Sequence, residues 1–401
     1  MKPSPSSVLC LLSSIIRPLP SVLLPHLEHL NWESFVKTAQ EEKLLPLLYY
    51  ACKQKSIVHL LPASVVATLQ SAYINNLGRT FFLKKALSEV LKAFNDQQVK
   101  IMLLKGGALL VETVYPDINT RMMSDIDFMV HPEDIAQVKR IFQDLDYTCI
   151  PDPWGETVKM NFIKDQFDFE LHTRPFSELL IPILPPEEMW EKAEKKRYGD
   201  SLVYLPSPDD LLYHCIFHEL IQHDHLFDIP LANLYEVDLI LKAFRKNIDL
   251  LALFHRAKHY RLEVHFSFFL RELENIFRSP LPCKVKEWID DIVNQFNPFY
   301  HRVCQLPGFL KKAGQRFFNF SILYELHRNN LKNYYSYYIE PILYSPADKI
   351  LSYYGLSPSY RLTAFLLRAI DIVKALLLHM VVRYFYLNEN AMNLSGCYSS
   401  H

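Results

Sequence analysis

Helical periodicity marks the first quarter of the chain. Over residues 6–94 the apolar residues recur at helical spacing, as at Trp32, Phe35 and Val36, and prolines stand at the joints between segments. This pattern predicts an all-helical region of about 90 residues.

The pattern changes between residues 98 and 174, where short apolar or alternating runs predict strands separated by helices. Few strands are expected outside this stretch. The order of elements expected there is a buried strand over 99–104, a helix over 107–115, a half-buried strand over 125–130, a helix over 132–145, and an antiparallel pair over 158–162 and 167–172.

Helical spacing returns after about residue 206, where Ser207, Pro208, Asp209 and Asp210 form a typical helix start. The prediction is an α+β protein with a small mixed sheet between helical regions. Its expected domains are an N-terminal helical domain over 1–95, a core over 96–205 that contains the sheet, and a C-terminal helical region over 206–401.

Composition narrows the class of protein. The chain has 401 residues, half of them apolar, with 43 Lys and Arg against 44 Asp and Glu, which excludes a disordered or coiled-coil protein. A net charge of −1 provides no long-range positive field for nucleic acid, although a local basic patch stays open, so small or neutral partners are favoured. The seven cysteines form no C-x-x-C pair, which argues against a disulfide framework and a zinc site and favours the cytoplasm.

Two apolar stretches near the ends of the chain raise the question of a membrane segment. The run over 8–16 is followed by Arg17 and two prolines without a cleavage site, so it is interpreted as a buried helix rather than a signal peptide. The stretch over 363–386 contains five charged or histidine residues, too many for a bilayer span, although a peripheral membrane contact stays open. No transmembrane segment is predicted.

Two of the predicted strands carry acids on one face. Alternation in the strand over 125–130 places Asp125 and Asp127 together, opposite the apolar side chains. Two like charges on a rigid strand repel each other, and a divalent cation resolves that repulsion. A third carboxylate is expected from a neighbouring strand, because alternation over 167–172 places on one face Asp168, Glu170 and His172.

A glycine pair precedes the acidic strand. Only 9 of the 401 residues are glycine, and two of them are adjacent, Gly106 and Gly107, after Lys105 at the end of a buried strand. Their backbone N–H groups open a helix, which is a favourable arrangement for binding phosphate. Arg121 adds a positive charge four residues before Asp125.

These residues together resemble the nucleotidyltransferase superfamily with the DNA polymerase beta type of catalytic fold, and within it a poorly characterised bacterial family. The superfamily pattern is a glycine pair opening a helix, then acid-x-acid on a strand, then a further acid, here Glu170. Two departures are that a serine often stands where this chain has Gly107, and that the third acid is usually Asp. The segments that carry the closer resemblance are 31–39, 45–49, 104–110, 121–128, 170–172 and 206–212.

The resemblance implies transfer of a nucleoside monophosphate from a nucleoside triphosphate (NTP), ATP among them, to an acceptor hydroxyl, with release of pyrophosphate. It implies two Mg²⁺ or Mn²⁺ ions held by Asp125, Asp127 and Glu170, with His172 beside them. The acceptor is an unidentified small molecule or protein. The residues expected at the nucleotide are Lys105, Gly106, Gly107, Arg121 and Ser124, with pairing to the acidic cluster as an equal alternative for Lys105.

Alternative interpretations stay open. A D-x-D glycosyltransferase would need alternating strands and helices before Asp125, where this chain is helical, and a silent binding or regulatory module would keep the fold without the reaction. His214, His218, His223 and His225 lack the H-E-x-x-H spacing of a zincin and are interpreted as core or pocket-lining residues, with metal or substrate contact as the alternatives. The eight tyrosines of residues 330–360 pack helices or stack on an acceptor.

Overall fold

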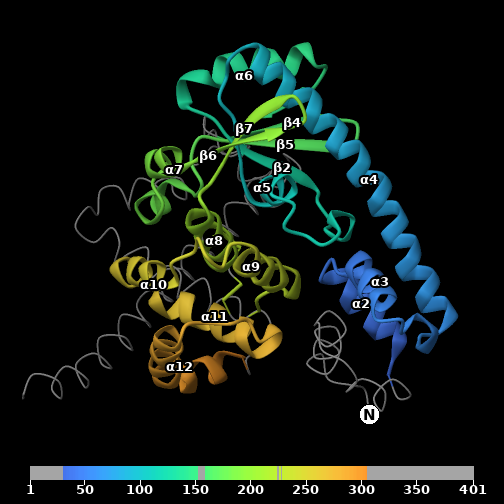
Figure 1. Ribbon diagram of the computed structural model, residues 1–401, viewed down its shortest axis with the longest axis vertical. Helices are drawn as coiled ribbons and strands as arrows, with labels where there is room; N and C mark the ends of the chain where they lie inside the picture. The colour runs from blue at the N-terminus through green and yellow to red at the C-terminus, as the bar shows by residue number, and fades with distance from the viewer. Residues whose placement is uncertain (1–29, 152–158, 224, 227, 305–401) are drawn as a thin grey trace, which may run out of the picture.

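The computed structural model describes residues 30–151, 159–223, 225–226 and 228–304 (Figure 1). The N-terminal apolar run, the tyrosine-rich stretch and the apolar stretch over 363–386 lie outside the described residues. Among the described helices, none is long and apolar enough to cross a bilayer.

Three helices form the N-terminal part of the described chain. Asn31 caps the first of them, because its side-chain oxygen accepts a hydrogen bond from the Ser34 N–H at 3.0 Å. The last is 34 residues long and continues from this helical part onto the sheet. The helices are α2 (Trp32–Glu41), α3 (Leu45–Gln54) and α4 (Ala63–Asp96), with a 3₁₀ turn η2 (Val58–Leu60).

A mixed sheet of seven strands forms the centre of the described structure, in the order β3-β4-β5-β2-β1-β7-β6. β2 pairs in parallel with β5 and antiparallel with β1, whereas β4 pairs antiparallel with β5. The strands are β1 (Met102–Leu103), β2 (Asp125–Met129), β3 (Thr148–Pro151), β4 (Lys159–Lys164), β5 (Phe167–His172), β6 (Glu194–Tyr198) and β7 (Ser201–Leu205).

An aromatic cluster fills one face of the sheet. Phe128 of β2 and Phe169 of β5 point towards α4 and towards α6 (Ile135–Asp144), where they meet Phe94 and Phe142. Phe142 also stacks on Phe162 of β4 with the ring centroids 4.0 Å apart. In Figure 1, α4 and α6 lie on one side of the sheet, and the remaining helices near it lie on the other.

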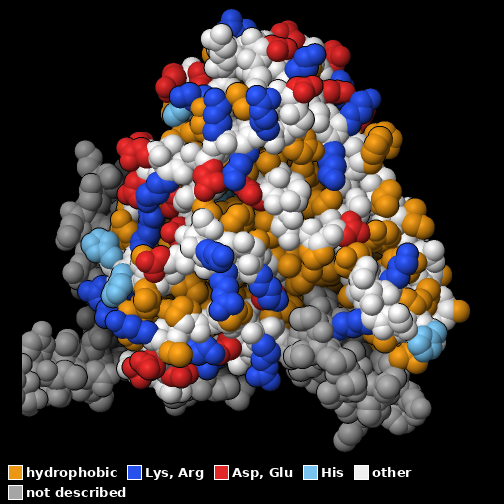
Figure 2. Space-filling model, viewed as in Figure 1, with side chains coloured by type: hydrophobic (Ala, Val, Ile, Leu, Met, Phe, Trp, Pro, Cys, Tyr) orange, Lys and Arg blue, Asp and Glu red, His pale blue; other side chains and the backbone are white. Residues whose placement is uncertain are grey.

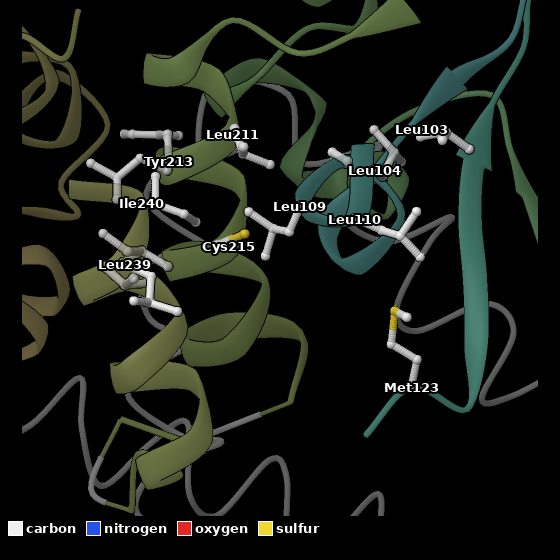
Figure 3. Packing of buried hydrophobic residues seen from close by; sticks show 14 of the residues in the cluster. Leu103, Leu104, Leu109, Leu110, Met123, Leu211, Tyr213, Cys215, Leu239 and Ile240 are labelled. Carbon is white, nitrogen blue, oxygen red and sulfur yellow. The ribbon is translucent and has the colours of Figure 1, made fainter. Parts of the chain in front are cut away.

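The opposite side of the sheet is joined to the C-terminal helices through a short helix, α5. Figure 3 shows Leu109 of α5 reaching towards Leu211 and Cys215 of α8, all three of them buried. The sheet and the C-terminal helices therefore share a continuous apolar core. The remaining helices are α5 (Lys105–Val111), α7 (Pro186–Lys192), α8 (Pro208–Phe217), α9 (Leu231–Ala243), α10 (Leu250–His259), α11 (Glu263–Phe277) and α12 (Cys283–Cys304), with the short turns η3 (Ile118–Thr120), η4 (Pro132–Asp134), η5 (Glu178–Ile183) and the π-helix η6 (His218–Gln222).

The predicted α+β class is confirmed, with helices flanking a mixed sheet. Ser207 caps α8 as its sequence predicts, accepting a hydrogen bond from the Asp210 N–H at 3.3 Å. Three strands lie outside the predicted set, namely β3 and the hairpin β6–β7. Two of these strands, β6 and β7, lie beyond residue 174 but within the core expected over 96–205, and the first strand is shorter than expected.

Large apolar side chains are exposed mainly along the outer side of α4. Figure 2 shows them gathered there, and among the described residues they include Ile74, Leu77, Phe81 and Phe82, of which Phe81 is 64% exposed. The inner side of the same helix is buried and polar at Asn76.

Candidate active site

The parallel pairing of β2 with β5 brings the predicted acids side by side. In this register Asp125 lies opposite Asp168, and Asp127 lies opposite Glu170. Because side chains alternate along a strand, these carboxylates all project from the face that does not carry Phe128 and Phe169. The chain thus assembles acids that are more than 40 residues apart in sequence.

Asp127 lies at the centre of this face and is only 7% exposed. Its Oδ1 accepts a hydrogen bond from the Lys105 Nζ at 2.8 Å and lies 3.0 Å from the His172 Nε2. Burial alone would raise the pKa of Asp127, but Lys105 and His172 outweigh it and hold that pKa well below its usual value. Asp127 is therefore a buried carboxylate that stays ionised.

His172 links Asp127 to Glu170, since its Nε2 lies 3.0 Å from a carboxylate oxygen of each. Burial acts to lower the pKa of His172, yet the two hydrogen-bonded carboxylates raise it above its ordinary value. One ligand atom from each of these three residues lies within 4.8 Å of the other two. Two carboxylates and an imidazole fit a divalent ion such as Mn²⁺ or Mg²⁺.

Asp125 and Asp168 flank this group. Asp125 is half-buried and accepts a hydrogen bond from the Ser124 hydroxyl at 3.0 Å. Both oxygens of Asp168 accept from the Asn161 amide, at 3.0 and 2.8 Å. Burial first, and then the nearby carboxylates led by Asp125, raise the pKa of Asp168. A fourth acid thus lies beside the three that the sequence singled out.

The glycine pair is buried and tightly packed. A Cβ on Gly106 would lie 2.3 Å from the Nη1 of Arg121, so only glycine leaves room for that guanidinium. A Cβ on Gly107 would lie 3.3 Å from the Cγ2 of Ile126 in β2. Lys105 before them has a φ of 42°, in the left-handed region that non-glycine residues seldom adopt. The sequence predicts that both glycines bind phosphate. The structure adds that the packing around each position also favours glycine.

Arg121 makes its ion pair with a helix far along the chain. Its Nε donates to Oε2 of Glu236 in α9 at 2.6 Å, and the Tyr115 hydroxyl donates to the same oxygen at 3.1 Å. Burial opposes the charge, but Glu236 raises the pKa of Arg121 above its ordinary value. The cation predicted to contact phosphate is therefore held between Gly106 and α9.

The segment before Asp125 is held by the inner side of α4. The Tyr73 hydroxyl donates to Oδ2 of Asp117 at 2.6 Å, and the Asn76 amide donates to the carbonyl oxygens of Asn119 and Arg121 at 2.6 and 2.9 Å. Because Asn76 is buried, these bonds are shielded from water. The position of the acid-x-acid strand is thus tied to the N-terminal helices.

A cavity of about 360 Å³ begins at Asp125 and extends between the helical parts. Three segments line it, namely residues 41–47 around the start of α3, residues 115–125 before and at the start of β2, and residues 219–236 from η6 to α9. Glu219 forms part of the wall and is hydrogen-bonded to His225 and Asn233. The cavity therefore joins the acidic face to both helical regions.

A family model described as "Uncharacterised nucleotidyltransferase" matches residues 28–278. The chain belongs to this family. No curated protein and no solved structure matches the chain. The matched range covers the acids, the glycine pair and all three segments that line the cavity. The predicted membership of a nucleotidyltransferase family is thereby confirmed, and with it a general role in nucleotidyl transfer.

The four clustered histidines of this nucleotidyltransferase divide between core and cavity. His214 is fully buried, with its Nε2 3.0 Å from the Pro175 carbonyl oxygen, whereas His223 and His225 line the cavity. Burial, and after it the charge of Lys105, lowers the pKa of His214 to about 3. Among the described residues these histidines form no group that could hold a metal; that group is Asp127, Glu170 and His172.

Sequence reasoning missed two polar residues of the site. Glu236, which fixes Arg121, lies within an apolar helical run, and no local pattern in the sequence connects it with residue 121. Glu219, in the cavity wall, belongs to the π-helix η6, and such irregular turns often occur at functional sites of proteins. A conserved charge in an apolar helix of the nucleotidyltransferase family would be the signal to look for.

Proposed function

We propose that the protein transfers a nucleoside monophosphate from an NTP to the hydroxyl of an acceptor and releases pyrophosphate. The observation that carries this proposal is the register of β2 and β5, which sets Glu170 opposite Asp127, two residues from Asp125, in a chain of this family. In the reaction, the acceptor oxygen forms a bond to the α-phosphorus. The bond from that phosphorus to the pyrophosphate oxygen breaks, and the hydroxyl proton is released.

Asp125, Asp127 and Glu170 are the proposed catalytic acids and ligands of two Mg²⁺ or Mn²⁺ ions, with His172 completing the set around Asp127 and Glu170. When bound, such ions neutralise phosphate charge and lower the pKa of the acceptor hydroxyl. The protein's own part is to hold three carboxylates on a rigid pair of strands, so that little reorganisation is needed during the reaction.

Lys105 is the proposed contact to the donor's phosphates, together with Gly106, Gly107, Arg121 and Ser124. Its ammonium group already lies 2.8 Å from Asp127, so an anion on this face would find a desolvated cation close to the acids. Arg121 would add its charge through the face turned away from Glu236. In this proposal both cations screen the triphosphate from the carboxylates.

The cytoplasm is the proposed compartment. Four cysteines of the described residues, Cys52, Cys149, Cys215 and Cys283, are free thiols, which suits a reducing environment.

The decisive experiment supplies the protein with each labelled NTP, with Mg²⁺ or Mn²⁺, and with a cell extract. We expect one labelled NTP to transfer its nucleotide to a component of the extract, with pyrophosphate released in equal amount. Glu133→Gln, which changes an exposed acid in η4, is the matched control and should transfer at the wild-type rate. A wild-type protein that releases no pyrophosphate with any NTP would contradict the proposal and favour a silent binding module.

Binding and chemistry can be separated by replacing Glu170. Calorimetry should show that Glu170→Gln still binds the NTP with Mg²⁺, because Asp125 and Asp127 remain, whereas turnover should fall by roughly two or more orders of magnitude. If Glu170→Gln turns over normally, Glu170 is not the third acid, and Asp168 opposite Asp125 takes its place as the candidate.

A further inference from the structure

The outer side of α4 carries four of the six large apolar side chains that are exposed among the described residues. Ile74, Leu77, Phe81 and Phe82 are between 43% and 64% exposed and lie within nine residues of one helix. We propose that this side of α4 is a dimer interface, which binds the same side of α4 in a second copy of the chain with the two helices antiparallel. The proposal is independent of nucleotidyl transfer.

A single stripe of residues runs along this side of α4. Its members follow one another at intervals of four and three residues in turn, the spacing that keeps side chains on one line of a helix that packs against another helix. All of them are exposed or half-buried, so the described chain leaves the stripe uncovered. The stripe consists of Ala67, Ser71, Ile74, Gly78, Phe81 and Lys85.

Gly78 is the member of the stripe that the single chain does not explain. It lies in the middle of a 34-residue helix, where glycine is less favourable than any residue except proline. A Cβ on Gly78 would meet no atom of the described residues within 4 Å, and its φ lies outside the left-handed region. Neither packing nor backbone conformation therefore requires a glycine here, unlike at Gly106 and Gly107. The close approach of a second helix would require one.

The order of large and small residues along the stripe is complementary to its own reverse. In an antiparallel pair of α4 helices that cross midway between Ile74 and Gly78, Ile74 of one copy faces Gly78 of the other. Phe81 of one copy likewise faces Ser71 of the other. Each large side chain of one helix thus meets a small residue of the other, as ridges meet grooves in packed helices. Two-fold symmetry repeats both contacts, which gives the self-complementary interface of a closed dimer.

Charge and size disfavour the other arrangements. A parallel pair in register would bring the two Lys85 ammonium groups together and would place Phe81 on Phe81, whereas antiparallel pairing places Lys85 opposite Ala67. A lipid surface would bind best to a stripe of large apolar side chains, and the small residues Ser71 and Gly78 add little apolar area. The stripe therefore fits a second copy of itself better than a membrane.

The exposed apolar area matches the need of a dimer. Large apolar side chains have full areas of about 200 Å², so the exposed parts of Ile74, Leu77, Phe81 and Phe82 amount to roughly 400 Å². A standard interface buries about 800 Å² per copy, of which slightly more than half, or roughly 450 Å², is apolar. These four side chains therefore provide most of the apolar part of such an interface.

The proposed interface leaves the candidate active site open. Asn76, which holds the segment before Asp125, is buried on the opposite side of the same helix. The inner side of α4 thus positions the acid-x-acid strand, while the outer side would join two copies. Each copy would keep its own set of acids.

Sedimentation equilibrium of the full chain between about 1 and 100 µM tests the association. Because the apolar core is small, we expect a monomer–dimer equilibrium with a dissociation constant of about 10 µM. The chain at about 1 µM is then mostly monomeric, so urea unfolding at that concentration measures the stability of the single chain. A chain that remains monomeric at 100 µM would overturn the proposal.

Gly78→Ile tests the place of the contact, because it fills the space that Ile74 of the second copy would occupy. Symmetry produces this clash twice, so the dissociation constant should rise roughly a hundredfold. Helix content measured by circular dichroism should be unchanged, since the Cβ of residue 78 has no neighbour within 4 Å in the described chain. Ala136→Ile, which adds the same side chain to an exposed position of α6, is the matched control and should associate like the wild type. Wild-type association of Gly78→Ile would overturn the proposal.

A second substitution tests the antiparallel direction. Ile74→Ala makes room opposite position 78, so the double variant Gly78→Ile/Ile74→Ala should associate about tenfold more tightly than Gly78→Ile, although Ile74→Ala alone should weaken the wild-type dimer. In a parallel dimer residue 78 would face residue 78, and Ile74→Ala would not relieve the clash. A double variant that associates no better than Gly78→Ile would therefore contradict the antiparallel contact.

Discussion

The two faces of the strand pair β2–β5 are built from alternate residues of the same ten or so positions, and they differ in polarity and charge. One face presents Phe128 and Phe169, which are fully buried among other aromatic rings. The other presents Asp127 and Glu170, whose charges are shielded from water beside Lys105. Successive residues of these strands therefore alternate between a face that packs in the core and a face that carries the proposed catalytic acids.

This division has an energetic consequence. Each ring on the aromatic face adds apolar burial and ring contacts, which favour folding. On the charged face, Asp127 loses hydration and is compensated by Lys105 and His172 only in the folded state. We expect substitutions on the first face to change stability and substitutions on the second to change activity, with Asp127 as the residue that changes both.

The largest effect is expected for Asp125→Asn. This change removes one proposed ligand charge from a half-buried position whose hydrogen bond to Ser124 an amide oxygen can still accept. Transfer should fall by about a thousandfold or more, with the melting temperature unchanged. Initial rates with labelled NTP and a thermal melt test this, and a variant with wild-type turnover would remove Asp125 from the catalytic set.

The opposite face should respond in the opposite way. Phe169→Ala deletes a fully buried ring of β5 that packs on Phe142 and Tyr147, and should lower the free energy of unfolding by about 4 kcal/mol while NTP affinity survives in the remaining folded protein. Phe81→Ala is the matched control, because that ring is 64% exposed and should change stability by about 0.5 kcal/mol or less. If urea unfolding shows the same loss of unfolding free energy in both variants, the aromatic face does not contribute to stability as expected.

Asp127→Asn should affect both properties, since it leaves the buried cation of Lys105 without its partner. We expect about 3 kcal/mol of lost stability together with loss of transfer. Adding Lys105→Met removes the unpaired charge, so the double variant should regain most of the stability and none of the activity. A double variant as unstable as Asp127→Asn would show that the ion pair is not the cause.

The smallest effect is expected for the pH dependence of stability that arises from His214, which is buried beside the charged face. The unfolded chain binds a proton there near pH 6.5, whereas the folded protein does so only near pH 3, so acidification favours unfolding. Between pH 6.5 and pH 5 this costs about 2 kcal/mol of stability. Urea unfolding at pH 7 and pH 5 measures how much free energy of unfolding is lost on acidification. This loss should be smaller in His214→Gln than in the wild type. It should equal that of the wild type in His59→Gln, which changes an exposed histidine.

Much of the sheet that carries the candidate site could be predicted from sequence because its signals are local. Alternation marked Asp125 and Asp127, and it marked Phe167 to His172 as a strand, which β5 confirms. The hairpin β6–β7 was missed since β6 is a charged edge strand, rich in lysine and arginine and therefore unlike a buried strand. Its turn at Gly199, with φ at 58°, was the available signal.

The surroundings of the site could not be predicted, because they depend on contacts between distant segments. Nothing near Arg121 in the sequence indicates that Glu236, 115 residues later, holds its guanidinium. The cavity likewise requires three segments that meet only in the folded chain.

The long helix α4 connects the segment before Asp125 with the N-terminal helices. Helix geometry gives its 34 residues a length of about 51 Å, and it fixes the segment before Asp125 through Tyr73 and Asn76 while also packing on α3 next to the cavity. If these contacts hold the cavity at one width, no closing step should accompany ligand binding. Stopped-flow binding should then show a single phase whose rate rises linearly with ligand concentration, without the plateau that a slow closing step produces.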